Sequence, residues 1–121
     1  MKRFSLIVAL MLGMFLFATS AQATVLRVVV VETSDPKAYM GEIEKLRAHN
    51  TRLGSKTILR VWRARFAGEQ AGDIVVSVEY ADLATMVADM AKSDADAEFS
   101  ATLKGMDGIR KIVSDSLYDE Q

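Results

Sequence analysis

Four short runs of the chain carry the residue types that strands prefer. Residues 25–32, 57–66, 73–80 and 109–118 are enriched in β-branched, aliphatic and aromatic side chains. The glycine-bounded segment 68–72 separates the second run from the third, which favours a hairpin. The pattern therefore predicts four strands, of which the middle two are joined directly.

A helical spacing fills the interval between the first two predicted strands. Asp35 suits the N-cap of this helix, Pro36 suits its first turn, and Gly54 suits a left-handed C-terminal cap. The residues that form one face recur at steps of four and three. They are Tyr39, Ile43, Leu46, Asn50 and Leu53.

A second helical region follows the third strand and begins at Asp82, a residue type that caps helices. We expect residues 93–96 to interrupt it, with Asp94 capping a further helical turn through Phe99 and Leu103. Gly105 and Gly108 are expected to end the region. The buried face of its first part should carry Leu83, Met86, Val87 and Met90.

The resulting order is β-α-β-β-α-β, the order of the ferredoxin-like α+β fold. In this fold a four-stranded antiparallel sheet is covered by helices on one face. The other face stays open, so the content of that face bears directly on function.

Alternation along each strand predicts which side chains face the helices. On this basis we expect Arg27, Arg60, Trp62 and Glu79 on the open face, together with several apolar side chains. The fourth strand fits either register. The side chains expected beneath the helices are Leu26, Val28, Val30, Leu59, Val61, Ile74, Val76, Val78 and Tyr80.

An apolar sheet face of this kind is rarely left in contact with water, so we expect two copies of the chain to pair through it. Pairing would bury charged groups, and buried charges need partners. Arg60 or Arg27 should therefore meet Glu79 or an anion from a ligand.

The N-terminus differs from the rest of the chain. Met1-Lys2-Arg3 is basic, residues 4–18 are almost wholly apolar, and Ala21-Gln22-Ala23 is a small-x-small exit. These are the three parts of a cleavable export signal. A retained membrane anchor is the alternative, although the apolar stretch is shorter than a spanning helix requires. We expect residues 1–23 to be removed and residues 24–121 to form one domain in the bacterial periplasm or outside the cell.

The composition of residues 24–121 restricts the possible chemistry. Loss of Lys2 and Arg3 takes the formal net charge from −1 to −3, which argues against a nucleic-acid partner and a polybasic membrane surface. The chain has no cysteine, which excludes disulfides and thiol catalysis. His49 is the only histidine, so we expect no transition-metal site and no cofactor. It lies on the polar face of the first helix, where a solvated surface role is expected.

The mature chain resembles the small dimeric α/β-barrel proteins, the superfamily of the antibiotic-biosynthesis monooxygenases and NIPSNAP-type domains. The resemblance rests on the element order, on residues 53–64 with Arg60-Val61-Trp62, on the glycines at 68 and 72, and on Ser116-Leu117-Tyr118 at the end. It implies a homodimer whose two sheets form a barrel. A pocket would lie inside the barrel or between each sheet and its helices.

The chain also departs from part of this superfamily. Haem-degrading members carry an Asn on the first strand, a Trp on the sheet and a His in the second helical region. Here only Trp62 has a counterpart, so the resemblance does not extend to haem degradation.

Five residues form the candidate ligand pocket: Arg60, Trp62, Glu79, Asn50 and Arg27. Arg60 and Trp62 form either a structural cation–π pair or an anion anchor beside a stacking surface. Glu79 is either the structural partner of an arginine or a general base. Asn50 either bonds to the helix end or the start of the second strand, or points into the pocket.

Three functions remain open at this point. The protein is an exported binding or accessory module for a small aromatic or anionic molecule, a cofactor-independent monooxygenase for a hydrophobic phenol, or a purely structural dimer. The monooxygenase function requires Trp62, Asn50 and Glu79 to converge on one substrate.

Overall fold

The computed structural model describes residues 23–66 and 68–121. The export signal expected at residues 1–23 therefore lies outside the described residues, apart from Ala23. The described elements are β1 (Val25–Glu32), α2 (Pro36–Arg52), β2 (Ile58–Arg63), the 3-10 turn η1 (Gly68–Gln70), β3 (Ile74–Tyr80), α3 (Leu83–Ala95), α4 (Ala97–Asp107) and β4 (Lys111–Asp119).

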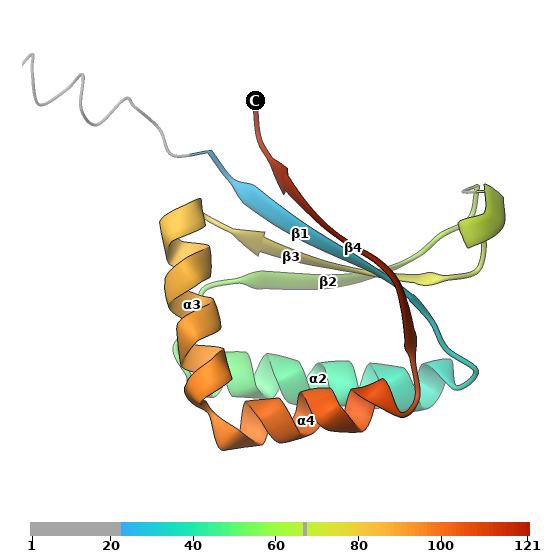
Figure 1. The fold of residues 1–121 in the computed structure, drawn as a ribbon, viewed down its shortest axis with the longest axis horizontal. Coiled ribbons are helices and arrows are strands. Elements are labelled where there is room, and N and C mark those ends of the chain that lie inside the picture. Colours follow the sequence, from blue (N-terminus) through green and yellow to red (C-terminus); the bar gives the residue numbers. More distant parts are fainter. Residues whose placement is uncertain (1–22, 67) are drawn as a thin grey trace, which may run out of the picture.

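The four strands form one antiparallel sheet in the order β2-β3-β1-β4. Figure 1 shows α2 and α4 side by side along one face of this sheet, while α3 rises beside one end of the strands. The predicted ferredoxin-like α+β fold is confirmed. Among the described helices, none is long and apolar enough to cross a bilayer.

The ends of α2 follow from local sequence, as predicted. The Asp35 carboxylate accepts a hydrogen bond from the backbone N–H of Ala38 at 3.0 Å, and Pro36 opens the helix. At the other end Gly54 adopts a left-handed conformation with φ of 71°, and the Ser55 N–H donates to the Asn50 carbonyl at 2.9 Å. This is the Schellman arrangement, in which two otherwise unpaired carbonyls of the last turn are satisfied.

The second helical region is two helices, and it differs from the prediction at the cap of its second helix and at Gly105, which lies inside α4 while Gly108 caps its end. Asp82 caps α3, as expected, through a 2.6 Å hydrogen bond from the Thr85 N–H. The cap of α4 is Asp96 rather than Asp94, because Asp96 is the residue with extended backbone and lies three positions before the Phe99 N–H that it accepts.

The predicted buried face of α3 is only partly correct. Met86 and Met90 are half-buried, but Leu83 and Val87 are 55% and 59% exposed. The helix stands beside the end of the sheet rather than beneath its centre (Figure 1), so one stripe of it meets the protein and the rest meets solvent.

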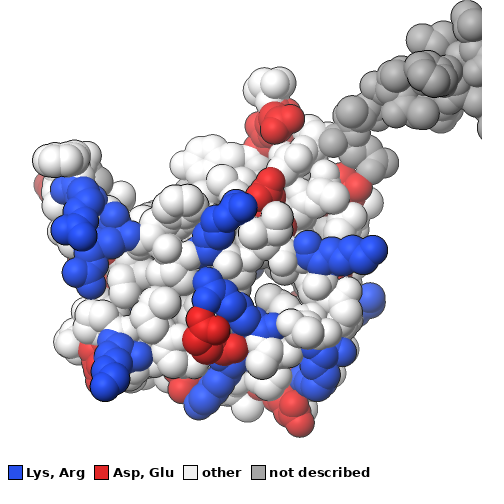
Figure 2. All heavy atoms as spheres, turned by 180° about the vertical axis from the view of Figure 1, so that it is seen from behind, with Lys and Arg blue, Asp and Glu red and all other residues white. Residues whose placement is uncertain are grey.

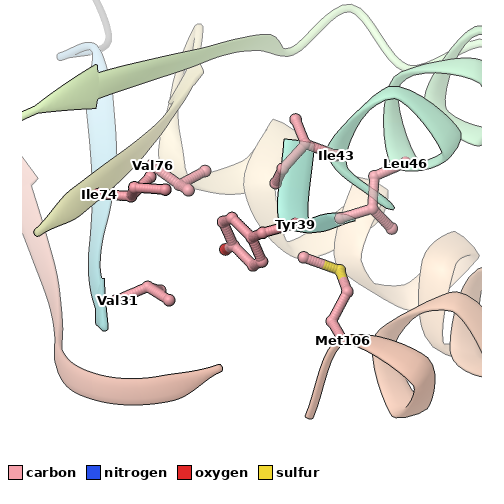
Figure 3. Packing of buried hydrophobic residues seen from close by; sticks show 7 residues of the cluster. All are labelled: Val31, Tyr39, Ile43, Leu46, Ile74, Val76 and Met106. Carbon is pink, nitrogen blue, oxygen red and sulfur yellow. The ribbon is translucent and has the colours of Figure 1, made fainter. Parts of the chain in front are cut away.

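The core lies between the sheet and the α2–α4 layer. Figure 3 shows side chains of α2 directed at the sheet, with Met106 of α4 closing the cluster from the side. Burying each such apolar side chain contributes about 1.5–3 kcal/mol. The seven members are Val31, Tyr39, Ile43, Leu46, Ile74, Val76 and Met106.

Strand pairing corrects the predicted orientation of β1. Val31 lies opposite Ile74 and Val29 opposite Val76, and all four side chains belong to or pack against the core beneath the helices. The expectation that Leu26, Val28 and Val30 face the helices is therefore wrong. Because β1 is apolar on both sides, its own alternation carries no preference, and its register against β3 decides the orientation. The orientations predicted for β2 and β3 are confirmed.

A β-bulge explains why the fourth strand showed no clear register. Val30 pairs with Ser114 and Val31 with Ile112, so β4 carries one extra residue, Val113, at this point. The bulge changes which positions face the helices, and both Ile112 and Asp115 turn toward them. A single alternating pattern cannot describe such a strand.

Candidate functional site

A cavity of about 220 Å³ lies between the sheet and the helices. Its walls are mostly aliphatic and aromatic, and they come from all three α-helices and all four strands of the described residues. The apolar side chains that matter most below are Val29, Leu46, Leu59, Val78, Phe99 and Leu103.

A polar group lies where the C-terminal end of α2 approaches α3. The Ser55 hydroxyl donates to the Asp89 carboxylate at 3.1 Å and lies 3.0 Å from the Thr57 hydroxyl. Asn50 also lines the cavity, and its side chain forms no hydrogen bond with the described residues. Of the two interpretations of Asn50, the one that points its amide into a pocket fits this position.

Arg27 lies in this cavity, not on the open face where the sequence placed it. Its guanidinium donates to both carboxylate oxygens of Asp115, from Nε at 3.0 Å and from Nη2 at 2.6 Å. These bonds raise the pKa of Arg27 and lower the pKa of Asp115. Both side chains remain more than a third exposed, so the pair forms part of the mouth of the cavity.

Tyr80 closes the cavity from the end of β3. The residue is only 7% exposed, yet its hydroxyl forms no hydrogen bond with the described residues. Burial raises the pKa of this hydroxyl, so the neutral phenol is favoured. It can both donate a hydrogen bond to a bound molecule and accept one from it.

Arg110 is a second guanidinium in the lining. It donates from Nη2 to Asp107 at 3.2 Å and from Nη1 to the Tyr39 hydroxyl at 3.5 Å, while its buried Nε has no partner among the described residues. Packing of its side chain beside the core positions it as a wall of the cavity.

Several residues of this cavity were missed by sequence reasoning. One signal was available for α3, since Asp89 falls three residues after Met86 and so lies on the same inward stripe. A carboxylate on a half-buried helix face is unusual and can mark a site. No such signal existed for Asp115 or Arg110, because their positions depend on the bulge in β4 and on the loop before it.

The open face of the sheet holds the other three predicted residues. Arg60 donates from Nη1 to Glu79 at 3.2 Å, so Glu79 is paired with one of the two arginines considered for it. The Trp62 indole N–H donates to the Ser77 hydroxyl at 2.8 Å. These side chains line a shallow groove of about 470 Å³ with Leu26 and Tyr118.

The five predicted pocket residues are thus divided between the two sides of the sheet. Arg60, Trp62 and Glu79 occupy the open face, whereas Asn50 and Arg27 line the cavity beneath the helices. The convergence of Trp62, Asn50 and Glu79 that an oxygenase mechanism required does not occur within one subunit.

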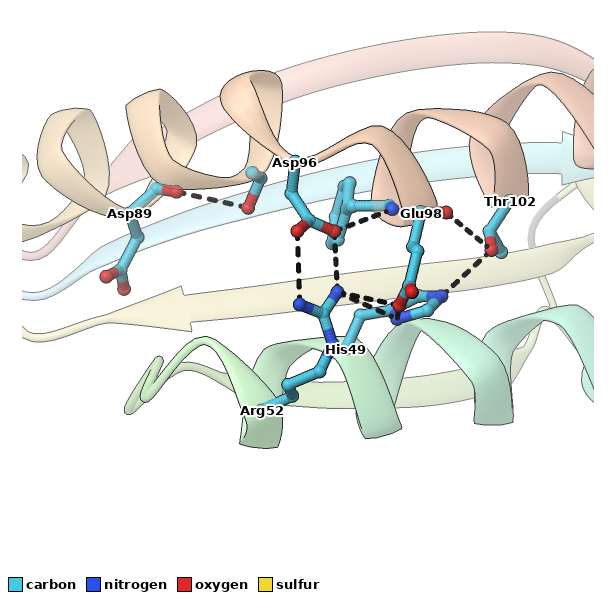
Figure 4. Close-up of polar contacts among 8 residues, drawn as sticks. His49, Arg52, Asp89, Asp96, Glu98 and Thr102 are labelled. Carbon is cyan, nitrogen blue, oxygen red and sulfur yellow. Dashed lines mark hydrogen bonds and ion pairs between the residues drawn. The ribbon is translucent and has the colours of Figure 1, made fainter.

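His49 lies between α2 and α4, which corrects its assignment as a solvated surface residue. Its Nε2 is 3.0 Å from the Thr102 hydroxyl (Figure 4). The centre of its ring lies 6.3 Å from the centre of the Phe99 ring. The side chain is directed across to α4 because that helix lies directly beside α2.

An ion-pair network surrounds His49 (Figure 4). Arg52 of α2 lies 2.6 Å from Asp96 and 3.3 Å from Glu98. The hydrogen bond from Arg52 lowers the pKa of Asp96. His49, Asp96 and Glu98 offer donor atoms within 4.8 Å of one another, the one such group among the described residues. A metal cation would have to displace the guanidinium of Arg52, so we assign this network to the packing of α2 on α4.

Comparison with known proteins supports the fold. No protein-family model matches the chain, and no curated protein matches it in sequence. Solved structures do match in shape. A NIPSNAP family protein from Agrobacterium tumefaciens superposes with a TM-score of 0.62 at 12% identity, over 82% of this chain and 90% of that one.

Two further structures lead to the same conclusion. A Bacteroides thetaiotaomicron protein provisionally named as an antibiotic biosynthesis monooxygenase gives a TM-score of 0.55 at 14% identity, over 84% of this chain and 90% of that one. SnoaB, a cofactor-independent oxygenase from Streptomyces nogalater, gives a TM-score of 0.57 at 12% identity, over 82% of this chain and 92% of that one. This chain therefore shares the ferredoxin-like fold of NIPSNAP and monooxygenase-like proteins, as its resemblance to them implied.

Proposed function

We propose that this chain is an exported protein that binds a small, largely apolar molecule in the cavity between its sheet and its helices. The observation that carries the proposal is the cavity itself, with apolar walls and with polar groups gathered near α3. Ligand sites in proteins have this character, since apolar walls supply affinity and a few polar groups fix orientation.

The volume indicates the size of the ligand. An apolar cavity of about 150 Å³ accommodates benzene. At about 220 Å³, the cavity of this chain suits one aromatic ring with a short substituent. Phe99 and Leu103 on one side and Val78 on the other would contact the faces of such a ring.

We further propose that two copies pair through their open faces. Trp62 and Tyr118 are 54% and 57% exposed in the single chain, and both border the same groove. Figure 2 shows acidic and basic side chains interspersed with uncharged surface on the side of the molecule opposite to that seen in Figure 1. A second copy would cover the exposed apolar area and enclose the Arg60–Glu79 pair.

Export is supported by the sequence of residues 1–23. Cleavage after Ala23 would leave β1 complete, because that strand begins at Val25. The bacterial periplasm or the extracellular medium would then be the site of function.

The binding proposal is tested by titrating the purified protein with single-ring aromatic molecules and measuring binding by calorimetry and by changes in methyl NMR signals. Leu59→Phe fills part of the cavity with a larger side chain and should abolish binding. Ile58→Phe is the matched control, since the neighbouring side chain points to the opposite face of β2. Absence of binding across the series, or unchanged binding by Leu59→Phe, would refute the proposal.

A further inference from the structure

The charges around the cavity indicate the charge of its ligand. We propose that the cavity accepts a small aromatic molecule that carries a protonated amine. This inference rests on the proposed function, because it names the class of ligand for the same cavity.

Both arginines of the cavity already have carboxylate partners. Arg27 is engaged by Asp115 through two hydrogen bonds, at 3.0 and 2.6 Å, and Arg110 by Asp107 at 3.2 Å. No lysine is among the described residues that line the cavity. An anionic ligand would therefore have to compete with an existing ion pair at Arg27 and at the Nη2 group of Arg110. The Nε group of Arg110 has no partner among the described residues, but it is fully buried and so is not open to a molecule in the cavity.

Two carboxylates of the lining have no such partner. Asp89 and Asp94 both belong to α3 and line the cavity, and neither forms an ion pair with a described residue. Asp89 accepts one hydrogen bond, from the neutral Ser55 hydroxyl. The α3 side of the cavity therefore has an excess of negative charge that a cation would neutralise.

Tyr80 supplies an independent observation. Its side chain is more than nine-tenths buried, and its hydroxyl faces the cavity without a hydrogen-bond partner among the described residues. The hydroxyl oxygen is not among the fully buried unpaired atoms of the described residues, so it remains open to water or to a molecule in the cavity. Arg27 and Asp89 line the same cavity as Tyr80, and both influence the ionisation of its hydroxyl. It can accept a hydrogen bond from an ammonium group that Asp89 or Asp94 neutralises.

The remaining lining accounts for the aromatic part. Phe99, Leu103 and Val78 provide apolar contacts but no donors or acceptors from their side chains. A ring bound against these side chains would direct its amine toward α3. The ring would then meet the apolar lining and the amine would meet the carboxylates. The anionic ligand expected from the sequence relied on Arg60 and Arg27, which the structure separates across the sheet and pairs with Glu79 and Asp115.

Three probes of similar shape test the charge: 2-phenylethylamine, 2-phenylethanol and phenylacetate. Each probe is titrated into the purified protein in its exported form, and its dissociation constant is measured by calorimetry. We expect the amine to bind about tenfold more tightly than the alcohol, because a charged hydrogen bond replaces a neutral one, and phenylacetate to bind most weakly.

Isosteric variants locate the effect. Asp89→Asn should reduce amine affinity about tenfold and leave the alcohol unchanged, since only the charge is removed. Asp94→Asn is an independent variant at the exposed mouth, where a loss of folding is not expected. Asp119→Asn, at the end of β4 and outside the cavity, is the matched control. Thermal unfolding confirms that each variant is folded.

The outcomes separate the two proposals. Binding of phenylacetate as tightly as the amine, or amine affinity unchanged in both the Asp89 and Asp94 variants, would overturn the inference while leaving a ligand cavity in place. Failure of all three probes and of the wider aromatic series would overturn the proposed function itself.

Discussion

Arg27 of β1 and Asp115 of β4 stand 88 residues apart in the chain and meet through two hydrogen bonds at the mouth of the cavity. The pair joins the strand at the centre of the sheet to the edge strand beside it. Its geometry is bidentate, which matches the planar guanidinium to the planar carboxylate. Partial exposure to solvent screens the pair and limits its energetic contribution.

This pair predicts a particular dependence of stability on pH. The pKa of Asp115 is lowered in the folded protein, so its contribution is complete above the unfolded value of about 3.9 and is lost as pH falls through the folded value. Asp115→Asn should reduce the free energy of unfolding at pH 7 by about 0.5–1 kcal/mol, after allowance for screening. The difference from the wild type should disappear in strong acid.

Urea unfolding at neutral and acidic pH measures this effect. Asp119→Asn on the same strand is the control, because Asp119 has no arginine partner among the described residues. A stability difference for Asp115→Asn that persists below the folded pKa would contradict the assignment of the effect to this carboxylate.

Two glycines of the α2 region should respond in opposite directions to alanine. Gly54 has a positive φ of 71°, and a Cβ at this position would meet open space, so Gly54→Ala should cost about 1–2 kcal/mol through backbone conformation alone. Gly41 lies within α2 and also has open space, so Gly41→Ala should stabilise by about 0.5–1 kcal/mol. Chemical denaturation measures the change in the free energy of unfolding for each variant. If both variants are stabilised, the Gly54 cap does not control the end of α2.

The proposed pairing of open faces is tested at Trp62. Trp62→Lys places a charge in the middle of the exposed apolar face and should shift the protein from dimer to monomer in sedimentation experiments at micromolar concentration. Val87→Lys is the control, because Val87 is similarly exposed but lies on α3. A wild-type protein that sediments as a monomer would refute the pairing directly.

The fluorescence of Trp62 provides a second measurement, since it is the only tryptophan of the chain. Dilution that dissociates a dimer should shift its emission to longer wavelength as the indole becomes solvated. Binding in the cavity on the other side of the sheet should change this emission much less.

Export predicts a defined mature N-terminus. Expression of the full chain in a Gram-negative host should yield periplasmic protein whose N-terminal residue is Thr24. Mass spectrometry of the purified protein measures this. Substituting Ala21 and Ala23 with Leu should prevent cleavage and leave the protein attached to the membrane. Recovery of wild-type protein that still begins at Met1 would contradict the signal-peptide interpretation.

Local sequence determined the element order, both ends of α2, the start of α3 and part of the core. Asp35 and Gly54 act within a few residues of their own positions, so their roles can be predicted without knowledge of the fold. β2 and β3 alternate apolar and polar residues clearly enough for their faces to be assigned.

Tertiary structure alone decided where the candidate site lies. Val28 to Val31 is apolar on both sides, so only pairing with β3 could turn Arg27 toward the helices, and only the bulge at Val113 could bring Asp115 to it. Local preferences act over a few residues, whereas strand register is set by contacts between distant segments. For that reason the sequence predicted the fold but divided the cavity residues incorrectly between the two faces of the sheet.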